Sequence, residues 1–280
     1  MLGEFLIGEV IENAEKNIKV NDGDYIGDDG LVYCGKCHTK KQKKIVFMGE
    51  ERTVMCLCKC GEEKRDADAE EQKKKDRMLE IQTMRSVGFH DSEMRKWTFD
   101  MDDEANPKVS SIARKFVENF DKMCEKGKGL MFYGGVGTGK TFISACIANA
   151  LIDKGVPCLV TNFSRLVNTI NGLYEGRQEY IDSLCNYKLL IIDDLGAERD
   201  TEYMGEIVQS IIDERYRSKL PVIITTNLTA ENIKYPEDIR KQRIYSRLFE
   251  MCYLVEVEAV DRRKKKYKEE HDEISSLLGL

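Results

Sequence analysis

Short apolar runs recur through the C-terminal two-thirds of the chain, and helix-like segments separate them. Four of the five runs are almost continuously apolar, which is typical of strands buried on both faces of a parallel sheet. Strands that alternate with helices predict an α/β domain, here a five-stranded parallel sheet flanked by helices. The predicted strands are Leu130–Tyr133, Cys158–Thr161, Leu189–Asp193, Val222–Thr226 and Cys252–Val257.

The segments between the predicted strands have the spacing of helices. Residues 140–153 are apolar almost all round, so a buried helix is expected there, ending before Pro157. Apolar positions between 203 and 212 form a buried stripe of a further helix, which Pro221 ends. A four-residue repeat predicts a helix ahead of the first strand: Ile112, Phe116, Phe120 and Cys124.

The N-terminal third has a different texture. Its first part is rich in glycine and in closely spaced cysteines, whereas 13 of the 16 residues in 62–77 are charged and cannot supply a core. We expect the charged run to be a solvated helix or a flexible connector. The predicted organisation is a small module over 1–61, a charged helical linker over 62–97, a nucleotide-binding domain over 98–260 and a basic, helical tail over 261–280.

A glycine-rich motif follows the first predicted strand and precedes the buried helix. It matches the phosphate-loop pattern G-x-x-x-x-G-K-[ST] at every position. In such a loop the glycines turn backbone N–H groups toward phosphates, the lysine adds a positive charge, and the hydroxyl binds Mg²⁺. Strand, loop and helix occur in the required order, so the sequence predicts an ATP site at Gly134, Gly135, Val136, Gly137, Thr138, Gly139, Lys140 and Thr141.

Two acidic residues end the third predicted strand, where ligands bind in α/β sheets. Asp193 is expected to hold Mg²⁺ with Thr141, and Asp194 to polarise the attacking water. A surface turn is the alternative explanation for a single acid at this place. Glu198 is a lesser candidate for the base.

Further polar residues follow the same pattern. Asn227 comes directly after the fourth strand, from which its amide can orient water against the γ-phosphate. Arg243 and Arg247 are four residues apart and share one face of a predicted helix. An arginine inserted by a neighbouring subunit can neutralise charge in a phosphoryl-transfer transition state, and a solvated surface arginine is the alternative.

Other classes of phosphate-loop protein fit less well. The sequence has no N-K-x-D motif to recognise guanine, and it has no arginine-rich lid like that of a small-molecule kinase. The dense basic run, Arg262–Lys268, can contact nucleic-acid phosphates or simply be a solvated terminal helix. The prediction is therefore an ATPase.

The cysteines of the first module form two groups, one of two residues and one of three. Cys34 and Cys37 form a C-x-x-C pair, and three more cysteines stand close together at 56, 58 and 60. Two such pairs make a tetrahedral Zn²⁺ site, which would give a small segment the stability that its core cannot. We predict the ligands Cys34, Cys37, Cys58 and Cys60, with Cys56 as substitute; a redox dithiol or plain core cysteines are the alternatives. The cysteines at 124, 146, 158, 185 and 252 are expected to be inert.

Composition narrows the setting. The net charge of −6 argues against a surface that binds nucleic acid generally, although a local basic strip is present near the C-terminus. No apolar run approaches the ~20 residues that cross a bilayer, and the acidic N-terminus does not resemble a signal peptide. Ten cysteines without an export signal indicate a reducing compartment. We therefore expect a cytoplasmic protein with no membrane partner.

The succession GGVGTGKT, LLIIDD, TTN and YSRL resembles the AAA+ ATPases of the DnaC/DnaI helicase-loader and IstB clade. The resemblance covers about residues 98–258 and includes TFD, DDLGAE and TTNL. It implies phosphate binding by Lys140 and Thr141, metal and water chemistry by Asp193 and Asp194, and a sensing role for Asn227. It also implies that Arg247 is a trans-acting arginine finger, and hence self-association through the ATPase interface. The clade has Asp-Glu or Asp-Asp at the acidic pair. With an aspartate at position 194, we expect this chain to hydrolyse ATP slowly.

The same resemblance implies a function. It suggests an ATP-dependent helicase loader in DNA replication that binds Mg·ATP and single-stranded DNA, with a replicative helicase as the partner of the zinc module. Gram-positive loaders of the DnaI kind carry a similar module. Phe163–Tyr174 lies where relatives contact single-stranded DNA, although its apolar spacing favours a core helix. The alternatives are an IstB-like transposition helper and an ATP-switched adaptor that barely hydrolyses.

Overall fold

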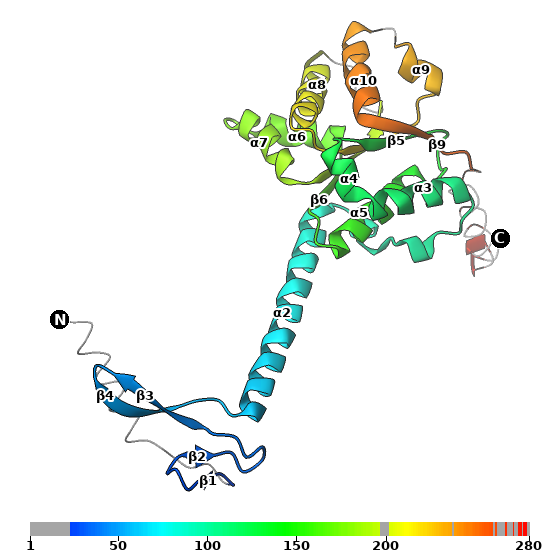
Figure 1. Cartoon of the computed structure of the whole chain (residues 1–280). Coiled ribbons are helices and arrows are strands. Elements are labelled where there is room, and N and C mark those ends of the chain that lie inside the picture. Colours follow the sequence, from blue (N-terminus) through cyan, green and yellow to red (C-terminus); the bar gives the residue numbers. More distant parts are fainter. Residues whose placement is uncertain are drawn as a thin grey trace. The chain divides into compact units, whose positions relative to one another are not determined.

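The computed structural model describes residues 23–196, 202–236 and 238–259, together with positions 261, 267, 271, 274–275 and 277–278. These residues belong to two compact units, which divide in sequence between Met78 and Leu79. Glu198 and most of the basic run Arg262–Lys268 lie outside the described residues. Figure 1 labels the elements of both units along the chain.

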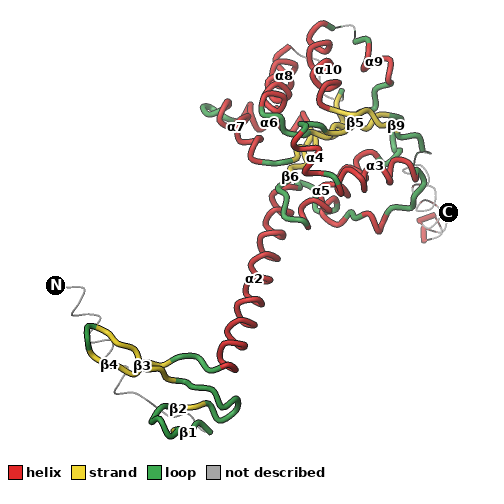
Figure 2. Tube along the Cα trace, in the orientation of Figure 1, coloured by secondary structure: helices red, strands yellow, loops and turns green. Residues whose placement is uncertain are grey.

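The second unit is built on the predicted five-stranded parallel sheet, which is thereby confirmed. The strands lie side by side in the order β6-β7-β8-β5-β9, and every neighbouring pair is parallel. Figure 2 shows helices on both faces of this sheet. The strand bounds are β5 Gly129–Tyr133, β6 Cys158–Asn162, β7 Leu189–Leu195, β8 Val222–Thr226 and β9 Cys252–Glu256.

Side chains of successive strand residues enter two separate cores, one on each face. Leu190 and Ile192 pack with the helices that follow β6, β7 and β8, whereas Leu189 and Ile191 pack with the helices before and after β5. Burial on both faces explains why the strands lack polar alternation. The helices are α3 Pro107–Glu118, α4 Phe120–Glu125, α5 Lys140–Asp153, α6 Phe163–Gly172, α7 Arg177–Ser183, α8 Glu202–Arg217, α9 Ala230–Lys234 and α10 Ile239–Met251. The 3₁₀ turns are η1 Met94–Lys96, η2 Phe99–Met101 and η3 Leu184–Asn186.

Two of the predicted helical segments can be compared with the structure in detail. The four-residue repeat before the first strand is divided between α3 and α4, because Asn119 ends the first helix and precedes the second. In α6 the side chains of Phe163, Leu166 and Ile170 are buried in the core. The apolar stripe of α6 is therefore a core stripe, and the polar face of the helix is exposed.

The described part of the first unit, which begins at residue 23, contains two small antiparallel sheets. One pairs β1 Tyr25–Ile26 with β2 Val32–Tyr33, and the other is a hairpin of β3 Gln42–Phe47 and β4 Glu50–Met55. The hairpin closes through Met48 and Gly49, both with positive φ, as tight hairpin turns require. α2, Lys59–Gly88, then carries the chain from the first unit into the second. Its residues 62–78, which include the charged run, are all exposed.

Within the described part of the chain, no helix has both the length and the apolar character that a membrane crossing requires.

Candidate functional site

The phosphate loop connects the end of β5 to the start of α5. Gly134, Gly137 and Gly139 have φ angles of 143°, 76° and 96°, which side chains rarely tolerate. A Cβ on Gly134 would also lie 2.5 Å from the Val257 carbonyl oxygen. These glycines are therefore required by the backbone, as the motif predicts. Gly139, the residue that precedes α5, has no side chain to cap the helix, and helix N-termini of this kind attract anions.

Lys140 lies at the centre of the site and is only 6% exposed. Its ammonium group donates to the carbonyl oxygens of Gly134 and Gly135 at 3.0 and 2.6 Å. It also donates to Oδ1 of Asn227 at 2.8 Å. The lysine of the loop and the amide at the end of β8 are thus in contact although 87 residues separate them in sequence.

The predicted metal residues are also brought together. The Thr141 hydroxyl donates to both carboxylate oxygens of Asp193, at 2.8 and 3.0 Å. A hydroxyl and a carboxylate side by side at the end of parallel strands are oxygen ligands that suit Mg²⁺. The residues present therefore fit the metal that accompanies a nucleotide.

Asp194 is held in an unusual backbone conformation beside this pair. Its φ is 62°, in the left-handed region that non-glycine residues seldom adopt. The Asn227 side-chain amide donates to Oδ1 of Asp194 at 2.7 Å, so one amide connects the loop lysine to the second acid. Asp193, Asp194 and Asn227 come from two neighbouring strands and converge on one edge of the sheet.

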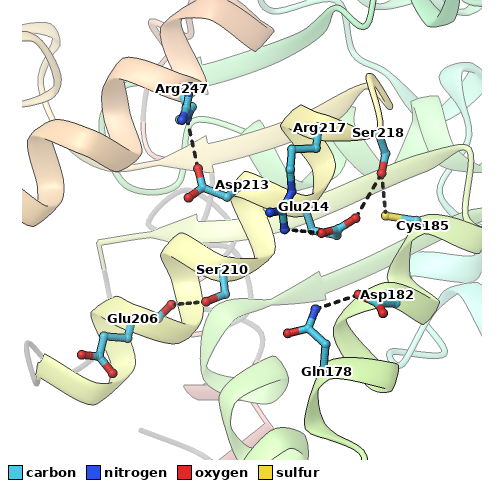
Figure 3. Close-up of polar contacts among 10 residues, drawn as sticks. All are labelled: Gln178, Asp182, Cys185, Glu206, Ser210, Asp213, Glu214, Arg217, Ser218 and Arg247. Carbon is cyan, nitrogen blue, oxygen red and sulfur yellow. Dashed lines mark hydrogen bonds and ion pairs between the residues drawn. The ribbon is translucent and has the colours of Figure 1, made fainter.

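Arg247 lies on α10, where its contacts are with α8. Its Nε donates to Oδ1 of Asp213 at 3.0 Å, a contact drawn in Figure 3. Its guanidinium carbon lies 4.4 Å from the centre of the Tyr216 ring. The hydrogen bond to Asp213 raises the pKa of Arg247. The side chain of Arg247 is 43% exposed although its guanidinium has these two contacts. Arg243 is exposed.

Two residues with close contacts to the predicted site were not singled out from the sequence. Asp213 pairs with Arg247, and the buried Thr225 hydroxyl contacts Asp193 and the amide of Asp194. Nothing in the sequence distinguishes Asp213 from the other charged residues of its helix. Thr225 does, because a hydroxyl within an apolar buried strand needs a hydrogen-bonding partner.

The cysteine cluster belongs to the first unit. The sulfur atoms of Cys34, Cys37, Cys58 and Cys60 all lie within 4.8 Å of one another, which suits a tetrahedral metal site. These are the four cysteines favoured from the sequence. The Cys56 thiol instead points to the Lys40 carbonyl oxygen at 3.6 Å.

The electrostatics of the cluster favour a thiolate at neutral pH. The pKa of Cys37 lies at about 5, because the Thr39 hydroxyl and then backbone groups hydrogen-bond its sulfur. The neighbouring Cys37 raises the pKa of Cys60 to about 11. Thiols that must ionise together in a small space repel one another, and a bound cation removes that repulsion. The donor set therefore suits a dication with thiolate ligands.

The cysteines of the second unit lie in other surroundings. Burial raises the pKa of Cys146 and of Cys252 to about 12 in each case. Burial also raises the pKa of Cys124 and Cys158. Thiols of this kind stay protonated, which agrees with the expectation that they are inert.

The sequence matches the family model described as IstB-like ATP binding protein over residues 62–270. The chain belongs to this family. Its phosphate loop, acidic strand end and Asn227 are thus parts of an ATP-binding protein with the AAA+ fold. The match begins within α2 and leaves the cysteine cluster outside.

Relatives of this IstB-like protein include two with assigned roles. It is 23% identical over 176 residues to the replicative helicase loader DnaI of Bacillus subtilis, covering 59% of this chain and 56% of DnaI. It is 28% identical over 134 residues to the replicative helicase loader DnaC of Escherichia coli, covering 46% and 54%. The chain thus spans about half the length of these curated relatives.

A solved structure supports the same fold. The crystal structure of DnaI superposes with a TM-score of 0.52 at 25% identity, covering 61% of this chain and 95% of that one.

Proposed function

We propose that the second unit binds Mg·ATP and hydrolyses it slowly. The observation that carries this proposal is the contact chain from Lys140 through Asn227 to Asp194, which joins three sequence motifs at one sheet edge. Such a chain places a positive charge for phosphates next to a carboxylate for water. Membership of an ATP-binding family supports it.

Each residue has a separate part in this proposal. The loop amides and Lys140 bind the phosphates, and Thr141 with Asp193 holds Mg²⁺, which would supply charge neutralisation at the phosphates. Asp194 accepts a proton from the attacking water, and Asn227 orients that water through its amide. Because Asn227 also contacts Lys140, its position is sensitive to what the lysine binds.

Arg247 completes the site from a neighbouring copy in this proposal. Asp213 and Tyr216 contact the guanidinium from within the chain, and the side chain is still 43% exposed, which would let a neighbouring copy reach it. An isolated chain would then hydrolyse ATP poorly, and activity would rise faster than linearly with protein concentration.

We further propose that the cysteine cluster binds a structural Zn²⁺ through Cys34, Cys37, Cys58 and Cys60. The close approach of the four sulfur atoms supports this. So does the exposure of the β3–β4 hairpin, which buries too little apolar surface to be stable alone.

The biological role that we propose is helicase loading in DNA replication, with the zinc module engaging a replicative helicase. The relatives named as replicative helicase loaders support it. Single-stranded DNA is the proposed second partner. The exposed face of α6 offers hydrogen-bonding groups at Asn168 and Thr169 and a charge at Arg165, and such side chains bind phosphates.

The IstB-like family match also allows a transposition helper, and a turnover close to zero would indicate an ATP-switched adaptor. Mixing the purified chain with a hexameric replicative helicase distinguishes a helicase loader from a transposition helper. A helicase loader forms a stable complex in gel filtration that Cys34→Ser/Cys37→Ser prevents, whereas a transposition helper forms none.

The ATP site itself is tested with Lys140→Ala. Nucleotide binding should be abolished while the fold persists, because the side chain contacts the loop rather than a core. Lys108→Ala is the matched control, since Lys108 is an exposed lysine of the same unit. Fluorescent-nucleotide titration measures both variants. Unchanged affinity in Lys140→Ala would refute the site.

A further inference from the structure

The two acids at the end of β7 face a single residue of β8. Ile192 pairs with Ile224, and the next pair is Leu195 with Thr226. Asp193 and Asp194 therefore lie opposite Thr225 alone, which makes this place a β-bulge. Bulges are common next to active sites because the extra residue re-aims a side chain.

The bulge explains how both acids reach one site. In a regular strand, successive side chains point to opposite faces of the sheet. Here the left-handed φ of Asp194 breaks that alternation. As a result Asp193 contacts Thr141 and Asp194 contacts Asn227, at the same edge.

The hydroxyl of Thr225 occupies the centre of the bulge. It donates to Oδ1 of Asp193 at 2.5 Å, and it accepts from the backbone N–H of Asp194 at 2.8 Å. The residue is only 1% exposed. A hydroxyl has one hydrogen to donate and lone pairs to accept, so both bonds form at the same time.

No aliphatic side chain can take over these two bonds. Without the hydroxyl, the Asp194 amide would lose its partner, and a partly buried N–H without a partner is unfavourable. A left-handed aspartate is itself unfavourable and persists only where its surroundings hold it. Asp194 would then relax toward ordinary strand geometry, which turns its carboxylate away from Asn227.

We propose that Thr225 is a positioning residue that fixes the metal-binding carboxylate of Asp193 and the water-activating carboxylate of Asp194 through one hydroxyl group. The proposal rests on the proposed Mg·ATP chemistry of these two acids. Thr225 itself acts only through them.

The test compares three variants of the full chain. Thr225→Val keeps the shape and removes the hydroxyl, and Thr225→Ser keeps the hydroxyl and removes the methyl group. Thr226→Val is the matched control, because among the described residues the fully buried Thr226 hydroxyl bonds two backbone groups, the Leu195 carbonyl and the Leu228 amide, and neither acid. If Thr225→Val does not fold, Thr225→Cys replaces it, since a thiol is a weak hydrogen-bond donor.

Three measurements are made on each variant. They are kcat and KM for Mg·ATP, Mn²⁺ affinity in the presence of ADP by electron paramagnetic resonance, and hydrogen exchange of the Asp194 amide. Thr225→Val should lose about 10- to 100-fold in kcat or in Mn²⁺ affinity, the range typical of residues that orient metal ligands. Its Asp194 amide should exchange faster, and its affinity for metal-free ATP should not change. Thr225→Ser should stay close to wild type.

Equal turnover and equal Mn²⁺ affinity in Thr225→Val and Thr226→Val would overturn the inference. A Thr225→Ser variant as impaired as Thr225→Val would do the same, because the methyl group would then be the important part. A wild-type chain with neither turnover nor Mn²⁺ binding would refute the proposed function instead. In that case the Asp194 amide exchange still decides whether Thr225 holds the bulge.

Discussion

In the second unit, named the ATPase unit after its proposed activity, strands β5 to β8 are buried on both faces. In the first unit, named the N-terminal unit, the β3–β4 hairpin leaves most of its side chains exposed. Ile191 is completely buried, while Val46 of the hairpin is 77% exposed. The ATPase unit has two apolar cores, and the described part of the N-terminal unit buries only a few apolar side chains, two of them cysteines of the cluster.

Because of this difference, the loss of a proposed site residue should have different consequences in the two units. In the ATPase unit, site residues stand at the edge of a sheet that the cores already hold, so removing one should cost activity and leave the fold. In the N-terminal unit the proposed metal ligands also replace the core, so removing them should cost the fold itself.

Removal of the proposed zinc ion should have the largest effect, the unfolding of the N-terminal module. A strong zinc chelator, or Cys34→Ser with Cys37→Ser, should release one zinc per chain and unfold the N-terminal module, because structural zinc contributes about 10–16 kcal/mol at pH 7. Hydrogen exchange should show lost protection over residues 23–58 and none lost in the ATPase unit. Cys56→Ser is the matched control and should retain the metal. Absence of zinc from the native protein by elemental analysis would contradict this prediction.

In the ATPase unit, Arg247→Ala should reduce the rate of ATP hydrolysis and leave the fold intact. Turnover should fall by about 10³- to 10⁵-fold, the range for arginine fingers, with ATP affinity nearly unchanged. Mixing this variant with Lys140→Ala should restore part of the activity, because one interface then joins an intact loop to an intact arginine. If both variants fold and assemble but the mixture stays inactive, Arg247 does not act in trans.

Asp194→Asn should have a smaller effect at the same site. Mg·ATP binding should persist, and hydrolysis should fall by about 10²- to 10⁴-fold, since an amide cannot accept the proton of the water. Single-turnover kinetics with bound ATP measure the step directly. Full turnover would move the role of base to another residue, with Glu198 the first to test.

The smallest effects are expected from two substitutions that test how tightly side chains pack in each unit. Ile191→Ala should destabilise the ATPase unit by about 2–5 kcal/mol, because it leaves a cavity between sheet and helices. Val46→Ala should change the stability of the N-terminal module by no more than about 0.5 kcal/mol, because the side chain is exposed. Denaturant unfolding followed in each unit measures both. A large effect of Val46→Ala would mean that the hairpin packs against a surface in solution.

The sequence predicted the sheet well because four of its five strands are almost continuous apolar runs that glycines and prolines separate. It also predicted the backbone of the loop between β5 and α5, because the glycines at 134, 137 and 139 have positive φ angles that other residues seldom adopt. The break between α3 and α4 was not predicted, because a four-residue apolar repeat continues through Asn119 whether the helix is one or two.

By itself the sequence determined which residue types are present, in which order, and the periodicity of their burial. That was enough for the fold class, the glycine positions of the loop after β5 and the closeness of the four cysteines. Only the tertiary structure decided which polar groups meet. The bulge opposite Thr225, the left-handed Asp194 and the pairing of Arg247 with Asp213 depend on register and helix packing. Those arise from contacts between distant segments, which no local pattern of residues encodes.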